Sequence, residues 1–234
     1  MLAIVDYQVG NLQSVTAAFE RLGVRPVITR DAETLRQAQA IVLPGVGAFP
    51  VAMEHLHRFG LVELLRERAA AGVPLLGICL GMQVLFETGF EGGVTPGLGL
   101  LPGVVKQIET TAKLPHIGWN NLQFNQPHPI ANLLVPDDEM YFVHSYYADC
   151  PEEVVIAYAE YGGVEIPAIV GRGNVVGCQF HPEKSSAIGS LVLQAFLEQI
   201  NSDSGNSTRH SAARDEVPTI AESNRRARGP KDDY

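Results

Sequence analysis

A cysteine stands between two glycines in the segment GICLGMQ, residues 77–83, directly after the apolar run VPLL. The pattern G-x-C-x-G at a strand-to-helix junction is typical of a nucleophile elbow, a tight turn that exposes the nucleophile at the end of a strand. Gly77 and Gly81 leave room in that turn because neither carries a side chain. At the start of a helix beginning near Leu80, the positive end of the helix dipole would favour the thiolate of Cys79. We therefore take Cys79 as a candidate nucleophile, with a buried structural cysteine as the alternative.

The segment QFHPEKSS, residues 179–186, supplies a candidate base. Side chains two residues apart in an extended segment point to the same side, so Glu183 can hold one imidazole nitrogen of His181. The other nitrogen is then free to take a proton from a thiol. His144 is a competing base, but it has no carboxylate at that spacing. Cys178 and His181 form C-x-x-H, yet a zinc site needs three or four ligands and no second pair is present, so we predict no metal site.

The tetrahedral intermediate formed by a thiolate needs hydrogen-bond donors for its oxyanion. The N–H of Leu80, directly after the nucleophile, is one candidate donor. The segment PGVG, residues 44–47, offers a second at Val46 or Gly47, because its glycines allow the intervening peptides to rotate. A simple turn between a strand and a helix is the alternative interpretation of PGVG.

The elements that must position these groups alternate in the first half of the chain. Short apolar runs predict buried strands, and the segments between them show helical spacing of apolar residues, as in Leu12, Val15, Phe19 and Leu22. Asn11 is the expected N-cap of that helix and Gly23 its stop. The predicted strands are 2–6, 26–29, 40–47 and 74–78, and the predicted helices are 11–23, 31–38, 61–72 and a segment starting at 80–87.

The second half changes to closely spaced strand-like runs with Gly, Asn and Pro between them, which favours hairpins or additions to a mixed sheet. These runs are 104–109, 116–124, 140–150, 154–162, 166–173 and 174–182. An amphipathic helix over 186–200 closes the fold. The sequence therefore predicts an α/β fold with an open mixed sheet and helices on both faces. Its N-terminal half is parallel and its C-terminal half adds antiparallel strands.

Residues 1–200 form one predicted domain, and residues 201–234 form a predicted disordered tail rich in Ser, Asn, Arg and Asp. The chain of 234 residues is 46% hydrophobic with a net charge of −9, which disfavours nonspecific binding to nucleic acid or to anionic membranes. Three cysteines without framework spacing argue against a disulfide scaffold. No targeting segment or apolar run long enough for a bilayer is visible, so we expect a cytoplasmic protein.

Taken together, GICLGMQ, PGVG and HPEKSS resemble the class I glutamine amidotransferases, whose triad is Cys, His and Glu in this order. The resemblance covers residues 1 to about 200 and implies that family's open mixed sheet, with no cofactor. It implies that Cys79 is the nucleophile, His181 the general base and then acid, and Glu183 its orienting partner. It also implies that the substrate glutamine is held by Gln83 and by the backbone around His144, Ser145 and Tyr146.

Finer motifs, among them DYQVGNLQSV, PHIGWNN and the single-valine PGVG, are similar to the glutaminase subunits of imidazole glycerol-phosphate synthases. That similarity implies a heterodimer with a cyclase partner, a (β/α)8 barrel whose interior carries ammonia to its acceptor. The products would be imidazole glycerol phosphate and aminoimidazole carboxamide ribotide, in histidine biosynthesis. The positions that would face the barrel are Asn11, Trp119, Tyr141 and Lys184.

Three other functions remain as alternatives. The chain could be a glutaminase feeding anthranilate, guanylate or carbamoyl-phosphate synthesis, although those differ in the motifs around the cysteine and the histidine. It could be a stand-alone cysteine hydrolase of γ-glutamyl or peptide bonds, which robust turnover by the isolated chain would favour. A non-catalytic binding module is disfavoured because Cys79 and Glu183 are both present.

Overall fold

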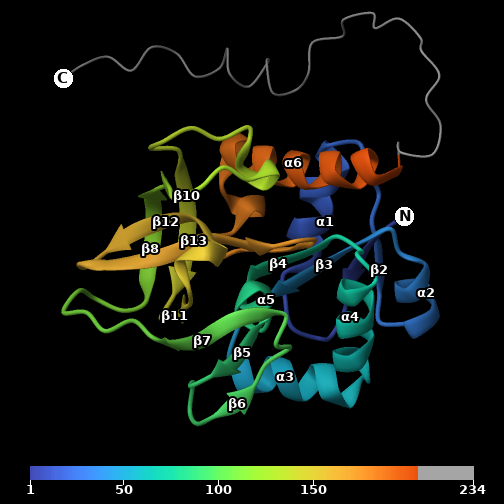
Figure 1. The fold of residues 1–234 in the computed structure, drawn as a ribbon, viewed down its shortest axis with the longest axis horizontal. Coiled ribbons are helices and arrows are strands. Elements are labelled where there is room, and N and C mark those ends of the chain that lie inside the picture. Colours follow the sequence, from blue (N-terminus) through green and yellow to red (C-terminus); the bar gives the residue numbers. More distant parts are fainter. Residues whose placement is uncertain (205–234) are drawn as a thin grey trace, which may run out of the picture.

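The computed structural model describes residues 1–204, with side chains described as far as residue 200. Its centre is an eight-stranded sheet with the order β2-β1-β3-β4-β14-β13-β12-β9 (Figure 1). The first five strands in this order run parallel: β2 (Val27–Thr29), β1 (Leu2–Val5), β3 (Ala40–Gly45), β4 (Leu75–Cys79) and β14 (Val175–Cys178). Antiparallel strands complete the sheet: β13 (Val164–Arg172), β12 (Val155–Tyr161) and β9 (Gln123–Phe124). The predicted mixed sheet is thus confirmed.

Helices cover both faces of this sheet, as Figure 1 shows. Alternation along β1 explains why both faces are apolar, since Leu2 and Ile4 enter one core while Ala3 and Val5 enter the other. The helices α1 (Leu12–Arg21) and α6 (Ser186–Ser204) pack on the first core. The second core is covered by α2 (Ala32–Gln37), α3 (Phe49–Arg58) and α4 (Leu61–Ala70).

Two smaller sheets flank the central one. An antiparallel pair joins β8 (His116–Asn121) to β10 (Glu139–His144). A four-stranded sheet has the order β11-β7-β5-β6 and consists of β11 (Tyr146–Asp149), β7 (Leu101–Gln107), β5 (Phe86–Gly89) and β6 (Thr95–Pro96). Short helical turns lie at α5 (Leu80–Gln83), η1 (Pro129–Ala131), η2 (Glu152–Val154) and η3 (Pro182–Lys184).

One expectation from the sequence is wrong in this region, and one helix was not predicted. The helix starting at Leu80 lasts only to Gln83, and the chain then enters β5 at Phe86, because β5 pairs with β7 and the carbonyls of Val84 and Leu85 accept backbone N–H groups from residues 98–101. A helix of one turn has a small dipole, so the dipole contributes little to Cys79. The helix α3 had no counterpart among the predicted elements, although its buried residues recur at helical spacing: Phe49, Ala52, Met53 and Leu56.

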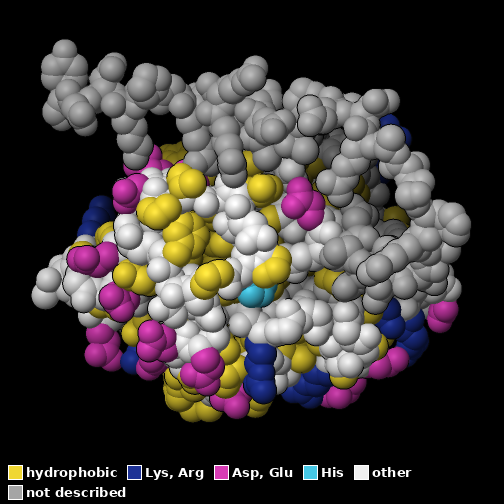
Figure 2. Space-filling view, turned by 45° about the horizontal axis from the view of Figure 1, so that its top comes forward, with side chains coloured by type: hydrophobic (Ala, Val, Ile, Leu, Met, Phe, Trp, Pro, Cys, Tyr) yellow, Lys and Arg dark blue, Asp and Glu magenta, His cyan; other side chains and the backbone are white. Residues whose placement is uncertain are grey.

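The helix α1 starts directly after Asn11, as predicted, but the Asn11 side chain makes no capping hydrogen bond. None of the helices in the described part of the chain is long and apolar enough to cross a membrane. The face in Figure 2 mixes hydrophobic, acidic and basic side chains, and its visible described residues form no continuous basic surface. The predicted disordered tail lies outside the described residues, apart from the last turn of α6.

Candidate active site

Cys79 ends β4 in a conformation that is rare for a residue with a side chain, at φ 55° and ψ −112°. The packing around the turn explains its two glycines. A Cβ on Gly77 would lie 2.6 Å from the carbonyl oxygen of Gly81, and a Cβ on Gly81 would overlap the carbonyl oxygen of Leu43 on β3. The turn is therefore pressed against the neighbouring strand, and only glycine fits at these two positions.

The pairing of β14 with β4 brings the histidine to the cysteine. Cys178 lies opposite Ile78 in this parallel pair, so the segments that follow the two strands leave the sheet at the same edge. Nδ1 of His181 lies 2.9 Å from Oε1 of Glu183, and both side chains are almost fully buried. Burial by itself lowers the pKa of His181, but interactions with Cys79 and Glu183 outweigh it and raise the pKa to about 9. Nε2 of His181 makes no hydrogen bond within the described residues and is free for proton transfer.

The competing base, His144, has both ring nitrogens engaged. Its Nδ1 lies 2.9 Å from the carbonyl oxygen of Tyr146 and must donate, so its Nε2 accepts from Nδ1 of His116 at 3.1 Å. Burial lowers the pKa of His144 to about 3; the hydrogen bond to the Tyr146 carbonyl opposes this shift, and His116 and His181 add to it. Burial likewise lowers the pKa of His116 to about 4. A neutral imidazole with no free nitrogen cannot relay a proton. His144 is therefore a structural part of the pocket lining, together with Tyr146.

The side-chain amides of Gln83 and Gln179 link Cys79 to Tyr146 in the pocket lining. Nε2 of Gln83 donates to the carbonyl oxygen of Tyr146 at 2.9 Å and to Oε1 of Gln179 at 3.0 Å. Nε2 of Gln179 in turn lies 3.8 Å from Sγ of Cys79. Gln179 is fully buried, and it was not among the residues predicted from the sequence, although it stands two residues before His181. Its amide supplies a donor to sulfur that the predicted triad lacks.

A pocket of about 280 Å³ opens beside Cys79. All the predicted oxyanion and substrate residues line it together with Cys79 and His181, namely Val46, Gly47, Leu80, Gln83, His144, Ser145 and Tyr146. Glu91 also lines it, and this residue was not predicted because nothing local marks a carboxylate in a loop. One oxygen of Glu91 accepts the backbone N–H of Phe49 at 2.8 Å, which fixes the carboxylate at the start of α3.

The PGVG segment and the helical turn at Leu80 line the same pocket, and Gly45 packs directly against Leu80 and Gly81. Gly45 is the register partner of Cys79, so the loop that follows begins beside the nucleophile. Val46 is 41% exposed, and Gly47 has a φ of 103°, in the region that favours glycine. The structure therefore places the predicted donors of Val46, Gly47 and Leu80 around one site.

The backbone of His181 is held by β10. Its N–H donates to the carbonyl oxygen of Tyr141 at 2.9 Å, and its carbonyl oxygen accepts from Oγ of Ser185 at 2.7 Å. The same Ser185 oxygen accepts the N–H of Tyr141 at 2.9 Å. Ser185 is fully buried and closes this ring of hydrogen bonds, which ties the candidate base to a strand of the smaller sheet.

The fold and the site together match a known family. The family described as glutamine amidotransferase class-I matches residues 3–200. The chain belongs to this family.

Curated relatives narrow the assignment within the class I amidotransferases. The chain is 60% identical over 199 residues to the imidazole glycerol phosphate synthase subunit HisH of Lactococcus lactis subsp. lactis (strain IL1403), covering 85% of this chain and 98% of that protein. It is 48% identical over 196 residues to the HisH subunit of Bacillus cereus (strain G9842), covering 84% and 93%. The HisH subunit of Streptococcus sanguinis (strain SK36) is 47% identical over 202 residues, covering 86% and 97%. The amidotransferase thus belongs to the HisH group.

Solved structures share the amidotransferase fold at lower identity. A crystal structure of a glutamine amidotransferase superposes with a TM-score of 0.68 at 22% identity, covering 85% of this chain and 98% of that one. The glutaminase domain of CTPS from Trypanosoma brucei, solved with bound acivicin, gives 0.60 at 15% identity, covering 86% and 93%. At these identities the likeness extends to the fold alone, and the predicted fold class is confirmed.

The positions expected to face a partner protein gather around η3 of the amidotransferase. Lys184 is exposed in η3, which contacts both α1, the helix that begins directly after Asn11, and β10, which carries Tyr141. Trp119 is the register partner of Tyr141, and their rings pack edge to face with centroids 6.0 Å apart. Trp119 is nonetheless 50% exposed, which is unusual for so large an aromatic side chain.

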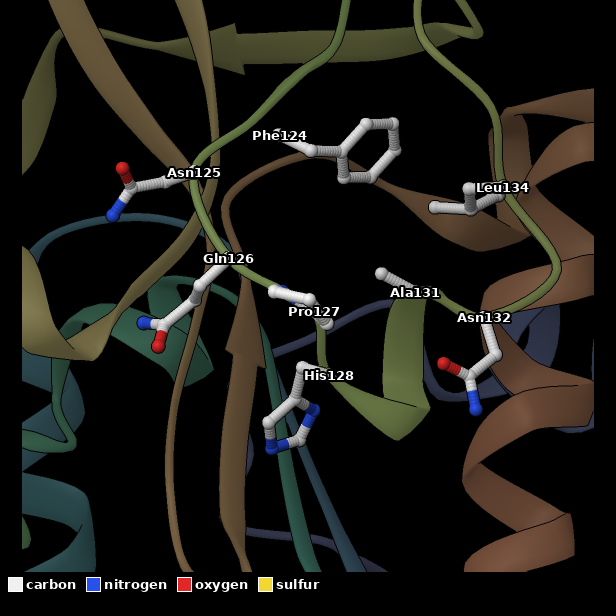
Figure 3. Close-up of a pocket in the computed structure, with 8 residues that line it drawn as sticks. All are labelled: Phe124, Asn125, Gln126, Pro127, His128, Ala131, Asn132 and Leu134. Carbon is white, nitrogen blue, oxygen red and sulfur yellow. The ribbon is translucent and has the colours of Figure 1, made fainter.

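The other features singled out in the sequence lie apart from this chemistry. Burial raises the pKa of the Cys150 thiol to about 12 and raises the pKa of the Cys178 thiol well above its ordinary value, which keeps both as thiols. The described residues contain no group of three or more His, Cys, Asp or Glu arranged to hold a metal ion. A second hollow, of about 350 Å³, lies near His128 (Figure 3). Phe124 and Leu134 turn into it, and it contains no cysteine or acid.

Proposed function

We propose that this amidotransferase hydrolyses glutamine to glutamate and ammonia through Cys79, His181 and Glu183, and that the ammonia passes directly to a cyclase partner. The observation that carries the proposal is that the strained Cys79 lines the same pocket as His181, whose Nδ1 is held by the buried Glu183. As a member of the HisH group, the chain is the glutaminase subunit of imidazole glycerol phosphate synthase in histidine biosynthesis.

The first half of the reaction forms a thioester. The Cys79 thiolate attacks the side-chain amide carbon of glutamine, and the N–H groups of Leu80 and Val46 or Gly47 hold the resulting oxyanion. With its pKa raised to about 9, His181 is protonated at neutral pH, so it can give the Nε2 proton to the departing nitrogen. The C–N bond breaks, ammonia leaves, and a γ-glutamyl thioester remains on Cys79.

The second half reverses the roles of His181. After giving up its proton, the imidazole accepts one from a water molecule as that water attacks the thioester carbon. The C–S bond breaks, glutamate leaves, and thiolate and imidazolium are restored. Glu183 keeps Nδ1 protonated through both halves, so that Nε2 always faces the reacting atoms.

The pocket walls suit an amino acid substrate. Glu91 is the one carboxylate among the described residues that line the pocket, and it can receive the α-ammonium group of glutamine. Gln83 and His144 both bond to the carbonyl oxygen of Tyr146 and hold the segment Ser145–Tyr146 in place for the rest of the substrate. The substrate is thereby gripped at the end remote from Cys79.

A partner is required by the chemistry of the product. Ammonia in bulk water near neutral pH is mostly ammonium and no longer a nucleophile, so release is productive only into a closed path. We propose that the partner is the (β/α)8-barrel cyclase, which docks over Asn11, Trp119, Tyr141 and Lys184 to form a heterodimer. Exposure of Trp119 supports this, because tryptophan is enriched at protein interfaces.

The decisive experiment measures glutamine hydrolysis by the chain alone, then with the cyclase, and then with the cyclase and its ribotide ligand. Activity is expected to rise steeply in the last step. Cys79→Ala should abolish glutamine-dependent synthesis by the complex while leaving synthesis from added ammonium near the parental rate. Equal loss of both activities would show that Cys79 does not act in ammonia generation, and full activity of the isolated chain would favour a stand-alone hydrolase.

A further inference from the structure

Tyr7 carries a buried hydroxyl group that lacks a partner. The residue follows β1, its side chain is fully buried, and no described residue forms a hydrogen bond with its hydroxyl oxygen. Burial, with a smaller contribution from nearby Cys79, raises the pKa of this phenol far above its usual value, so the hydroxyl always keeps its proton. A buried donor without an acceptor is unfavourable, and such groups are rare in folded proteins.

The hydroxyl lies directly against Gly45, the residue that leads into the oxyanion loop. A Cβ on Gly45 would be 2.6 Å from the Tyr7 oxygen and 2.8 Å from the backbone nitrogen of Gly81. The backbone of Tyr7 is anchored by a hydrogen bond between its carbonyl oxygen and Nδ1 of His55 at 2.9 Å, and the side chain is fully enclosed. The unpartnered donor is thus fixed between the strand that ends beside Cys79 and the turn that carries Cys79.

We propose that Tyr7 is a positioning residue for the oxyanion loop, and that its hydroxyl donates to the carbonyl oxygen of Gly45 in the active conformation. The peptide plane gives the reason. The N–H of Val46 and the C=O of Gly45 belong to one planar trans peptide and point in opposite directions. When that peptide rotates so that its N–H points into the pocket, its carbonyl oxygen points away from the pocket, toward the Tyr7 hydroxyl, which has no other acceptor among the described residues.

This proposal rests on the glutaminase function. It adds that the Tyr7 hydroxyl orients the peptide carrying the Val46 N–H, the second oxyanion donor. The acceptor becomes available only in the active conformation, so the resting structure leaves the hydroxyl unsatisfied. The energy of the new hydrogen bond then favours the rotated peptide over the resting one. Glycine is required at position 45 for two reasons: its peptide rotates freely, and the absence of a Cβ lets the Tyr7 hydroxyl approach.

The test is Tyr7→Phe in the complex with the cyclase and its ribotide ligand. We expect kcat for glutamine to fall about two- to tenfold, the factor for one ordinary hydrogen bond, while KM changes little. The melting temperature should stay equal or rise, because the variant removes a buried donor that is unpaired at rest. The rate at which iodoacetamide alkylates Cys79 should not change, because alkylation forms no oxyanion. Tyr158→Phe, which removes a half-buried hydroxyl from β12, serves as the matched control and should behave as the parent.

Three results would overturn the proposal. A parental kcat in Tyr7→Phe would show that the hydroxyl is a packing feature without a role in the reaction. A lower melting temperature would show that it has a partner in the resting protein. Parallel loss of kcat and of Cys79 alkylation would show that it acts on the thiol and not on the loop. The parent protein is measured alongside. If the parent failed to hydrolyse glutamine in the complex, the proposed function would be wrong, and the role of Tyr7, which rests on it, would be wrong as well.

Discussion

The side-chain amide of Gln179 lies 3.8 Å from the sulfur of Cys79, and the same side chain accepts a hydrogen bond from Gln83. One buried glutamine thus touches both Cys79, the proposed nucleophile, and Gln83, which holds the Tyr146 segment proposed to contact the substrate. An N–H donor favours the negative sulfur over the neutral one, in the way that charge-assisted hydrogen bonds generally do.

Replacing Gln179 with Leu removes the donor to sulfur and the acceptor of Gln83. We expect kcat for glutamine to fall about tenfold, the size of one hydrogen bond to a charged group, and KM to rise because the Tyr146 wall loosens. The alkylation rate of Cys79 by iodoacetamide should fall with kcat. Gln37→Leu, at an exposed position of α2, is the control and should change neither rate. Unchanged alkylation in the Gln179 variant would contradict a role for its amide at the sulfur.

Replacing Glu183 with Gln removes the carboxylate from His181. We expect kcat to fall by about 10²- to 10⁴-fold, the usual range for losing general acid–base catalysis. The effect on stability has a defined sign. A histidine whose pKa rises from 6.5 to about 9 on folding stabilises the protein fully below its unfolded pKa, and this contribution is lost as pH rises through about 9.

Urea unfolding between about pH 6 and pH 9.5 measures that contribution. The parent should lose up to about 3 kcal/mol of unfolding free energy across this window through His181. In Glu183→Gln the loss should be smaller, because one of the interactions that raise the pKa is gone. A parent whose stability rose with pH over the same range would show that His181 is not held in its protonated form.

Replacing Gly81 with Ala tests the packing of the elbow against β3. The new methyl group would overlap the carbonyl oxygen of Leu43, so we expect a loss of about 3 kcal/mol or more in unfolding free energy. Gly173→Ala is the matched control. It lies at φ 61° in open space and should lose only about 1–2 kcal/mol, from the left-handed conformation alone. Thermal melts would compare the two, and equal losses would mean that the turn can relax away from the strand.

Replacing Val46 with Pro deletes the N–H proposed as the second oxyanion donor. Loss of one such donor typically lowers kcat by about 10²–10³-fold. The variant should still bind the cyclase but show no rise in activity when the ribotide ligand is added. Val46→Ala keeps the N–H and should be activated like the parent. If the proline variant responded fully to the ligand, the N–H of Gly47 would become the donor to test.

The parts of the site that local spacing determines were predictable from the sequence. The glycines around Cys79 mark the turn, and the two-residue spacing of His181 and Glu183 marks their contact. The meeting of these two segments was not predictable from spacing, because it depends on β14 entering the sheet beside β4, about a hundred residues away along the chain. The family resemblance supplied that link.

Residues that act through tertiary contacts received no role from the sequence. Tyr7 lies in DYQVGNLQSV, and Gln179 and Ser185 lie in QFHPEKSS, but neither motif shows what these side chains face in the fold. Glu91 lies outside the motifs and becomes notable only through the pocket that it lines. The segment 84–89 shows the same limit for secondary structure. Its apolar residues suit a helix, but pairing of β5 with β7 outweighs that local preference, as tertiary contacts often do.

Tyr141 and His181 are joined peptide to peptide, with Ser185 closing the ring between them. Tyr141 of β10 and the proposed catalytic histidine are therefore parts of one hydrogen-bonded unit. We expect a partner that contacts Tyr141, as proposed above, to shift the backbone of His181 as well as to gain contact area. Substitutions on this surface should then alter turnover along with affinity, and the two would be difficult to tune separately.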